Sequence, residues 1–312
     1  MEKRRASAEQ RKELKYLGML AGAGVILFFC AQLLVSFLIS ATPLRGYYES
    51  NMAVRYACSC AASILSVGGV FYLMRLLGMR MLGIASPLPL RPERFPTFVL
   101  AIPAGFGLCL SANYISAFVG MLTDSFGVEL TQPEELLPAD PAGIAVYLLS
   151  AAIIPPVVEE FAVRGVLMQP LLKYGRGFAV CASALVFGMM HSNPKQMIFA
   201  FVSGVVIGFF TASTGSLLTG MAIHLCNNAF AVANSYLVQA GEEMTAGLLM
   251  AAALFVGILS LIAWLVLALK SSGGRERTRM PGGRWRYFIN MVFLLAAALM
   301  AVNASQYIRI GG

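Results

Sequence analysis

Two adjacent carboxylates and an arginine occur inside one long apolar run, in the segment Pro155-Pro156-Val-Val-Glu159-Glu160-Phe-Ala-Val-Arg164. An ionisable side chain at the centre of a bilayer costs about 2.5 to 3.5 kcal/mol on insertion scales, so such residues indicate function or pairing. Glu160 and Arg164 are four residues apart and can pair on one face of a helix. Glu159 is rotated about 100° from Glu160. The segment alone fits either a general base beside an ion pair or a purely structural ion pair with a spare glutamate.

The chain has only two histidines, and each lies near another side chain at helical spacing. Phe187 and His191 are four residues apart at the end of one apolar run, and His224 and Asn228 are four residues apart inside another. Residues at this spacing share a helix face. Each pair alone fits an interfacial histidine or an interhelical hydrogen bond. Asn227 is an alternative to Asn228, because the spacing does not separate the two.

Taken together, these residue types form a hydrolytic set. A carboxylate (Glu159) and His191 can activate a water molecule, while His224 and Asn228 can polarise a carbonyl oxygen. Glu159, His191 and His224 are also the ligand types of many catalytic zinc sites. The chain contains no HExxH helix and no GxSxG segment, which excludes the usual zincin and serine-hydrolase motifs.

The composition indicates that these residues lie within a membrane. Hydrophobic residues make up 58% of the 312 residues, charged residues only 12%, and the mean hydropathy is +0.75. A soluble domain carries about 25% charged residues. The net charge of +8 comes from loops and from the N-terminal segment, without a basic patch interleaved with aromatics. We therefore expect membrane lipid as the surroundings and no nucleic-acid partner.

Apolar runs that can position the set recur along the chain. A membrane-spanning helix needs about 20 apolar residues, and a bilayer leaves an open chain no alternative to helix. The sequence predicts an all-α, polytopic transmembrane bundle of eight to nine spans, the fifth and sixth being the shortest, with 17–40 an uncleaved first span. The predicted spans are 17–40, 53–77, 96–122, 142–170, 177–192, 196–213, 215–238, 245–270 and 287–304.

Loop charges predict the orientation of this bundle. Lys and Arg gather at the N-terminus and in every second loop, which places these segments on the cytoplasmic side. The segment 124–140 on the other side holds Asp124, Glu129, Glu134, Glu135 and Asp140 and no base. We expect an integral protein of a bacterial plasma membrane with its N-terminus in the cytoplasm. The same pattern puts His191 near the outer end of its span and Glu159 toward the middle of a long helix, so their contact requires a tilted or re-entrant span.

Three motifs in this order resemble the CPBP family, which comprises CAAX-prenyl-protease-type and bacteriocin-processing intramembrane proteases, also called the Abi family. The motifs are Glu159-Glu160-x-x-x-Arg164, Phe187-x-x-x-His191 and His224-x-x-x-Asn228. The resemblance covers roughly residues 140–240. We expect this segment to be the catalytic core, with N-terminal helices in 1–135 and C-terminal helices in 241–312.

The resemblance implies an endopeptidase that cleaves a membrane-associated or lipidated protein or peptide. Glu159 and His191 would activate the water, and His224 and Asn228 would hold the oxyanion. Glu160 and Arg164 of the first motif would orient the site. Members of the family are commonly labelled metalloproteases, although a metal-free glutamate mechanism is also argued, so a divalent ion such as zinc stays open. The resemblance also leaves open the natural substrate and the oligomeric state.

Two further functions remain alternatives to an enzyme. Some members of the family act as non-catalytic scaffolds or regulators, as in bacteriocin self-immunity, and full function after Glu159→Ala would favour this class. A transporter also places charges inside its spans. Transporters often contain repeats, and none is visible in this sequence, which ranks that class third.

Overall fold

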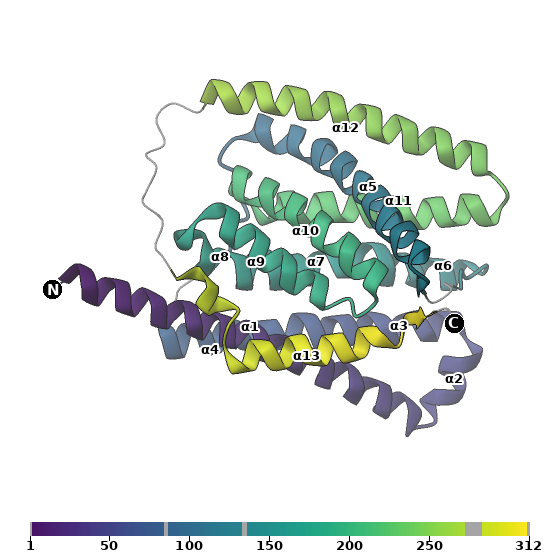
Figure 1. Cartoon of the computed structure of the whole chain (residues 1–312). Coiled ribbons are helices and arrows are strands. Elements are labelled where there is room, and N and C mark those ends of the chain that lie inside the picture. The colour runs from purple at the N-terminus through teal and green to yellow at the C-terminus, as the bar shows by residue number, and fades with distance from the viewer. Residues whose placement is uncertain (1, 84–86, 133–135, 272–282, 311–312) are drawn as a thin grey trace.

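The computed structural model describes residues 2–83, 87–132, 136–271 and 283–310, and these form a bundle of helices with one short pair of strands (Figure 1). The helices of the first half are α1 (Glu2–Ser40), α2 (Leu44–Ser50), α3 (Met52–Ser63), the π-helical η1 (Ile64–Gly69), α4 (Val70–Leu82) and α5 (Phe95–Ser125). Those of the middle are α6 (Pro141–Leu148), η2 (Leu149–Ile153), α7 (Ile154–Glu160), η3 (Phe161–Met168), α8 (Gln169–Leu171) and η4 (Leu172–Tyr174). The remainder are α9 (Arg176–Met189), α10 (Pro194–Thr214), α11 (Leu217–Gln239), α12 (Glu243–Ser271), η5 (Arg284–Tyr287) and α13 (Met291–Ser305). Strands β1 (Val128–Leu130) and β2 (Ile308–Ile310) pair antiparallel.

The predicted transmembrane bundle is confirmed, with differences among its spans. Six helical segments are long and apolar enough to cross a membrane, namely Ala8–Ser40, Met52–Met81, Phe95–Ser125, Pro141–Tyr174, Pro194–Thr214 and Glu243–Lys270. The apolar helices Arg176–Met189 and Met291–Ser305 are shorter. At 1.5 Å per residue they are only about 21 to 23 Å long, against a hydrocarbon core of about 30 Å. Helix α11 has 23 residues but carries several polar ones.

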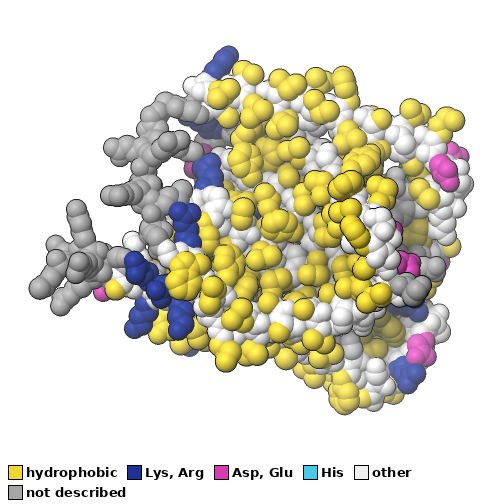
Figure 2. All heavy atoms as spheres, in the orientation of Figure 1, with side chains coloured by type: hydrophobic (Ala, Val, Ile, Leu, Met, Phe, Trp, Pro, Cys, Tyr) yellow, Lys and Arg dark blue, Asp and Glu magenta, His cyan; other side chains and the backbone are white. Residues whose placement is uncertain are grey.

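The surface of the bundle has an apolar belt between two charged ends. Figure 2 shows most of the visible Lys and Arg side chains at the end where the N-terminus lies, and most of the visible Asp and Glu at the opposite end. The bases Arg275, Arg277 and Arg279 of the predicted cytoplasmic loop lie outside the described residues. This segregation agrees with the loop-charge pattern, while the orientation itself stays a prediction.

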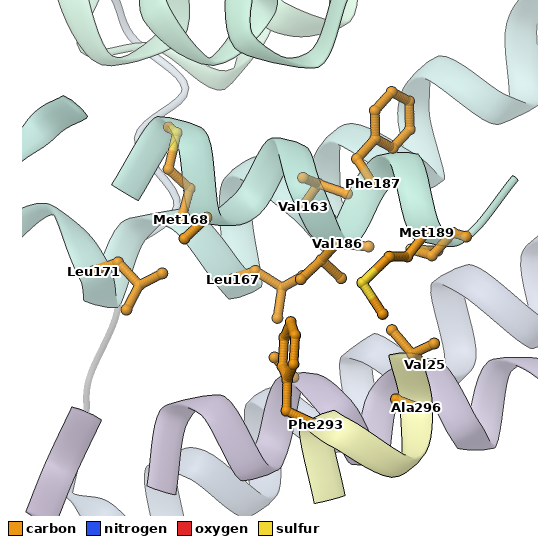
Figure 3. Packing of buried hydrophobic residues seen from close by; sticks show 14 of the residues in the cluster. Val25, Val163, Leu167, Met168, Leu171, Val186, Phe187, Met189, Phe293 and Ala296 are labelled. Carbon is orange, nitrogen blue, oxygen red and sulfur yellow. The ribbon is translucent and has the colours of Figure 1, made fainter. Parts of the chain in front are cut away.

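The two largest of the three apolar clusters among the described residues hold most of the helices together. In the larger one, α1 and α13 pack against η3 and α9, where Val25 and Phe293 face Leu167 and Val186 (Figure 3). The smaller cluster joins α5, α10, α11 and α12. Small residues let membrane helices approach closely. At Gly22 of α1 an added Cβ would lie 2.7 Å from backbone atoms of Phe293 in α13.

Polar side chains at the helix ends fix where the central helices begin. The carboxylate of Asp140 accepts from Gly143 N and starts α6, and Asn193 Oδ1 accepts from two backbone amides at the start of α10. Ser216 caps α11 and also donates to the carbonyl of Leu90. Such N-caps satisfy amides that the helix leaves unpaired. The caps of α6 and α11 thereby set where the segments with the first and third motifs begin, whereas α9, which carries the second motif, has no side-chain cap.

Candidate active site

The first motif lies where two π-helical segments interrupt a long helix. Glu159 and Glu160 end α7, with η2 before it and η3 after it. Pro155 has no N–H, so it leaves the carbonyl of Ala151, four residues earlier, without its helical donor. Asn228 Nδ2 donates to that carbonyl at 3.0 Å. The prolines therefore break the regular helix just before Glu159, and α11 satisfies the carbonyl that is released.

Glu160 and Arg164 form the predicted ion pair in the interior of the bundle. Arg164 Nη1 lies 2.7 Å from Glu160 Oε1, and neither side chain is exposed. Arg164 also donates through Nη2 to the carbonyl of Gly204 at 2.8 Å, and its guanidinium lies 4.9 Å from the ring centre of Phe187. A buried pair offsets its desolvation cost only when further hydrogen bonds satisfy it. Here α9 and α10 both contribute to holding Arg164.

His224 lies between the two carboxylates. Its Nδ1 is 3.0 Å from Glu160 Oε1, and its Nε2 is 3.8 Å from Glu159 Oε2. The ion pair with Arg164 keeps Glu160 in the carboxylate form, which only accepts hydrogen bonds. Nδ1 of His224 therefore carries a proton and donates to Glu160. This bond fixes the imidazole so that Nε2 faces Glu159.

His191 is held by the last turn of its own helix. Its Nδ1 lies 2.9 Å from the carbonyl oxygen of Phe187, and the two rings meet edge to face at 4.8 Å. A carbonyl only accepts, so Nδ1 donates and the neutral ring keeps a lone pair on Nε2. Phe187 also lies 5.8 Å from the ring of His224. This phenylalanine thus separates the two histidines and contacts both.

Glu159 and His191 line one cavity of about 410 Å³. The side chain of Glu159 is 18% exposed, in contrast to the fully buried Glu160. The shared cavity resolves the difficulty that the loop charges posed, because the end of α9 and residues of η1 and α7 line the same space. Its walls also include residues of α1 and α13, which the sequence did not assign to the site.

Asn228 lies on a different cavity. Together with Asn227 it lines a space of about 720 Å³ between α5, α10, α11 and α12. Asn228 accepts a hydrogen bond from Asn227 at 3.3 Å and donates to Ala151. The structure brings His224 to the two glutamates, and it places Asn228 one turn further along, against η2.

The predicted metal ligands do not form a ligand cluster. Among the described residues, no group of three or more His, Cys, Asp or Glu side chains is placed to hold a metal ion. Nδ1 of His224 donates to Glu160, and Nδ1 of His191 donates to a backbone carbonyl. These bonds leave Nε2 of both histidines free, as in many metal-bound histidines, but Glu159, His191 and His224 are not gathered as a ligand group among the described residues. The chemistry below therefore uses the chain's own groups.

Several residues around the site were not found from the sequence. Gly220 lies against the buried carboxylate, since an added Cβ would be 2.8 Å from Glu160 Oε2. Ser192, directly after His191, has φ 59, and Asn303 Nδ2 donates to its hydroxyl at 3.3 Å. Asn303 is a polar residue in an apolar run, which is the signal that could have identified it.

Comparison with known proteins places this site within a described domain. Residues 141–230 match the family described as type II CAAX prenyl endopeptidase Rce1-like. YdiL of Bacillus subtilis (strain 168), described as a candidate membrane peptidase, is 24% identical over 148 residues, which are 45% of this chain and 60% of YdiL. The membrane-embedded CAAX protease MroQ of Staphylococcus aureus (strain USA300) is 26% identical over 136 residues, which are 41% of this chain and 54% of MroQ.

The matched segment thus covers less than two thirds of either relative. No solved structure gives a significant match. All three motifs lie inside the matched residues 141–230. Through this segment, the chain is similar to the CPBP family of membrane CAAX proteases and related peptidases.

Proposed function

We propose that this protein is an intramembrane endopeptidase that hydrolyses a peptide bond of a membrane-associated or lipidated protein or peptide. The observation that carries the proposal is the row of contacts from Arg164 through Glu160 to His224, which ends 3.8 Å from Glu159 at the edge of a cavity. Charged groups inside a membrane are costly. A row that leads to a cavity shared with His191 suits catalysis better than a structural pair does.

In this proposal Glu159 is the general base. A water molecule in the cavity gives one proton to the carboxylate of Glu159 while its oxygen attacks the substrate carbonyl carbon. His191 accepts a hydrogen bond from the same water through its free Nε2 and orients it. When the carbon–nitrogen bond breaks, Glu159 returns the proton to the leaving nitrogen. The products are a carboxyl group and an amine, and the enzyme is unchanged.

His224 supplies the group that stabilises the oxyanion. Its Nδ1–H donates to Glu160, and a protonated Nε2 would donate to the oxygen of the tetrahedral intermediate. Glu159 and Glu160 then balance Arg164 and His224, so the four charges sum to zero. Because both nitrogens of His224 are fixed by this arrangement, the donor needs little reorganisation as negative charge develops on the substrate.

Asn228 has two amide hydrogens, and one of them is committed to Ala151. We propose that this bond keeps the interrupted helix in the shape that presents Glu159. The second hydrogen remains a donor to the oxyanion in this proposal, as the family resemblance implies. No step of this mechanism is routed through a metal, because the described donors are not gathered to hold one.

The proposed substrate class follows from the cavity and from the relatives. Apolar side chains such as Phe28, Phe29 and Met190 line the cavity beside polar ones, which fits a polypeptide segment at a membrane. The name of MroQ states a CAAX protease. We propose a lipid-anchored or membrane-embedded peptide as the substrate of this chain.

The test is cleavage of dye-quenched peptides by purified protein in lipid nanodiscs, using farnesylated and membrane-anchored peptides. We expect wild type to cleave at least one peptide and Glu159→Gln to cleave none. Glu129→Gln is the matched control, because Glu129 is exposed on β1 and does not line the cavity. Treatment with a chelator is expected to leave the wild-type rate unchanged. Cleavage by Glu159→Gln at the wild-type rate would reject the mechanism, and full biological function without cleavage would favour the scaffold.

A further inference from the structure

The cavity that holds Glu159 and His191 has one wall built by helices outside the family-matched segment. Helices α1 and α13 contribute that wall, which carries the amide side chains of Gln32, Asn303 and Gln306. Helix α13 is otherwise almost wholly apolar. Asn303 near the end of α13 and its C-cap residue Gln306 line the cavity from this helix.

These amides are linked to the turn that carries His191. Gln306 Nε2 donates to Asn303 Oδ1 at 3.0 Å, and Asn303 Nδ2 donates to Ser192 Oγ at 3.3 Å. Ser192 is the one described residue other than glycine with a positive φ. Such a backbone costs about 1 to 3 kcal/mol and is typical of ligand-binding and catalytic sites. The wall therefore contacts the residue that directly follows His191.

Backbone pairing holds the end of α13 in place. The carbonyl of Tyr307 accepts from both the backbone N–H and the hydroxyl of Thr131, at 2.8 and 3.1 Å. The carbonyl of Thr131 accepts from Asn193 Nδ2 at 2.8 Å. The pairing of β1 with β2 continues this connection. The amide wall is thus fixed relative to the His191 turn, as a binding site requires.

Asn303 and Gln306 line the cavity and retain unused hydrogen-bonding capacity. Asn303 can donate a second amide hydrogen, and Gln306 can accept through Oε1, since no described residue bonds to that oxygen. A donor and an acceptor of this kind match the C=O and N–H of an extended peptide. No Lys or Arg is among the described residues that line the cavity, so an anionic lipid headgroup would find no cation.

We infer that Asn303 and Gln306 form a subsite that binds the main chain of a peptide substrate beside the scissile bond. The inference rests on the proposed function and deepens it. It assigns peptide recognition to α13, while Glu159, His191 and His224 of the matched segment carry the chemistry. Phe28 and Phe29 of α1 contribute the apolar surface for the side chains of that peptide.

The test measures binding rather than cleavage. The full chain carrying Glu159→Gln is placed in nanodiscs of phosphatidylglycerol and phosphatidylethanolamine. Fluorescence anisotropy then gives the Kd of a farnesylated, fluorescein-labelled peptide and of its counterpart with N-methylated main-chain amides. We expect N-methylation to weaken binding about 2- to 10-fold, as for the loss of one or two hydrogen bonds.

When Asn303→Leu or Gln306→Met is introduced into the Glu159→Gln protein, binding of the unmodified peptide is expected to weaken by a similar factor. The effect of N-methylation is expected to disappear. Ser305→Ala is the control, because Ser305 is exposed on the same turn and its hydroxyl bonds only to the carbonyl of Val302. Gln306 is exposed, so its substitution leaves the fold intact even if that of Asn303 does not.

Two results would overturn the subsite. One is an unchanged Kd and an unchanged N-methylation effect in Gln306→Met, and the other is a parent protein that shows no saturable binding of the peptide. Failure of the proposed function gives a different pattern, in which the peptides bind as expected but the chain with Glu159 intact leaves them uncleaved.

Discussion

Replacing Gly220 with alanine is expected to impair the site without removing any ionisable group. The added Cβ would lie 2.8 Å from Glu160 Oε2 and 2.6 Å from Thr211 Oγ1. Both contacts fall well short of 3.4 Å, where ordinary van der Waals contact begins. The carboxylate must therefore move by several tenths of an ångström. Glu160 Oε1 accepts hydrogen bonds from Arg164 at 2.7 Å and from His224 at 3.0 Å. Movement of the carboxylate therefore disturbs both bonds.

The magnitude follows from the hydrogen bond that is weakened. A hydrogen bond to a charged group contributes about 1.5 to 3 kcal/mol. Loss of that amount in the transition state lowers kcat/KM about 10- to 150-fold. Overpacking a buried site also costs about 1 to 3 kcal/mol of stability. Gly220→Ala should therefore lose most of its peptidase activity while it still folds.

The assay is kcat/KM for a cleaved peptide in nanodiscs, with thermal unfolding measured on the same preparation. Gly247→Ala is the matched control, because Gly247 lies in α12 and an added Cβ there meets nothing within 4 Å. This control should retain wild-type activity. If Gly220→Ala cleaved as fast as Gly247→Ala, the placement of Glu160 behind His224 would be wrong.

Further variants separate the roles of the remaining residues. Arg164→Met should destabilise the fold by about 3 to 5 kcal/mol, because it leaves the buried Glu160 without its arginine partner and with His224 as its remaining contact. The double variant Arg164→Met with Glu160→Leu should recover stability in thermal unfolding but not activity, and equal stability of the single and the double variant would contradict this. His191→Gln should lower kcat about 10²- to 10⁴-fold with little change in thermal unfolding, and a change confined to KM would argue against its role at the water. Asn228→Leu should lower the unfolding free energy by about 1 to 3 kcal/mol, because the carbonyl of Ala151 loses its donor, and Asn228→Leu with wild-type stability would refute that.

The sequence predicted the helical architecture well because the membrane constrains it strongly. All nine predicted runs coincide with helices, and the i, i+4 pairing of Glu160 with Arg164 is present as expected. Both rest on local periodicity, which a single sequence contains. The fifth run was correctly predicted to be short, as α9 shows, whereas the sixth run is the 21-residue α10, which is long enough to cross a membrane.

The contacts between helices could not be read from spacing. The sequence paired His224 with Asn228 along one helix, whereas the structure directs His224 to Glu160 and Asn228 to Ala151. The π-helical segments around Glu159 change which residues face α11, and regular helical geometry does not include them. The contribution of Asn303 depends on how α13 packs against α1 and α9, which no local pattern encodes.

The most direct test of the central claim, that Glu159 activates water, is a single turnover in H₂¹⁸O with enzyme in excess over a cleaved peptide. Mass spectrometry then follows the label in the new carboxyl group and in Glu159. The mechanism predicts one ¹⁸O atom in the product carboxylate and none in Glu159, with no product from Glu159→Gln. An unlabelled first product with ¹⁸O in Glu159, or labelled product formed at the wild-type rate by Glu159→Gln, would contradict it.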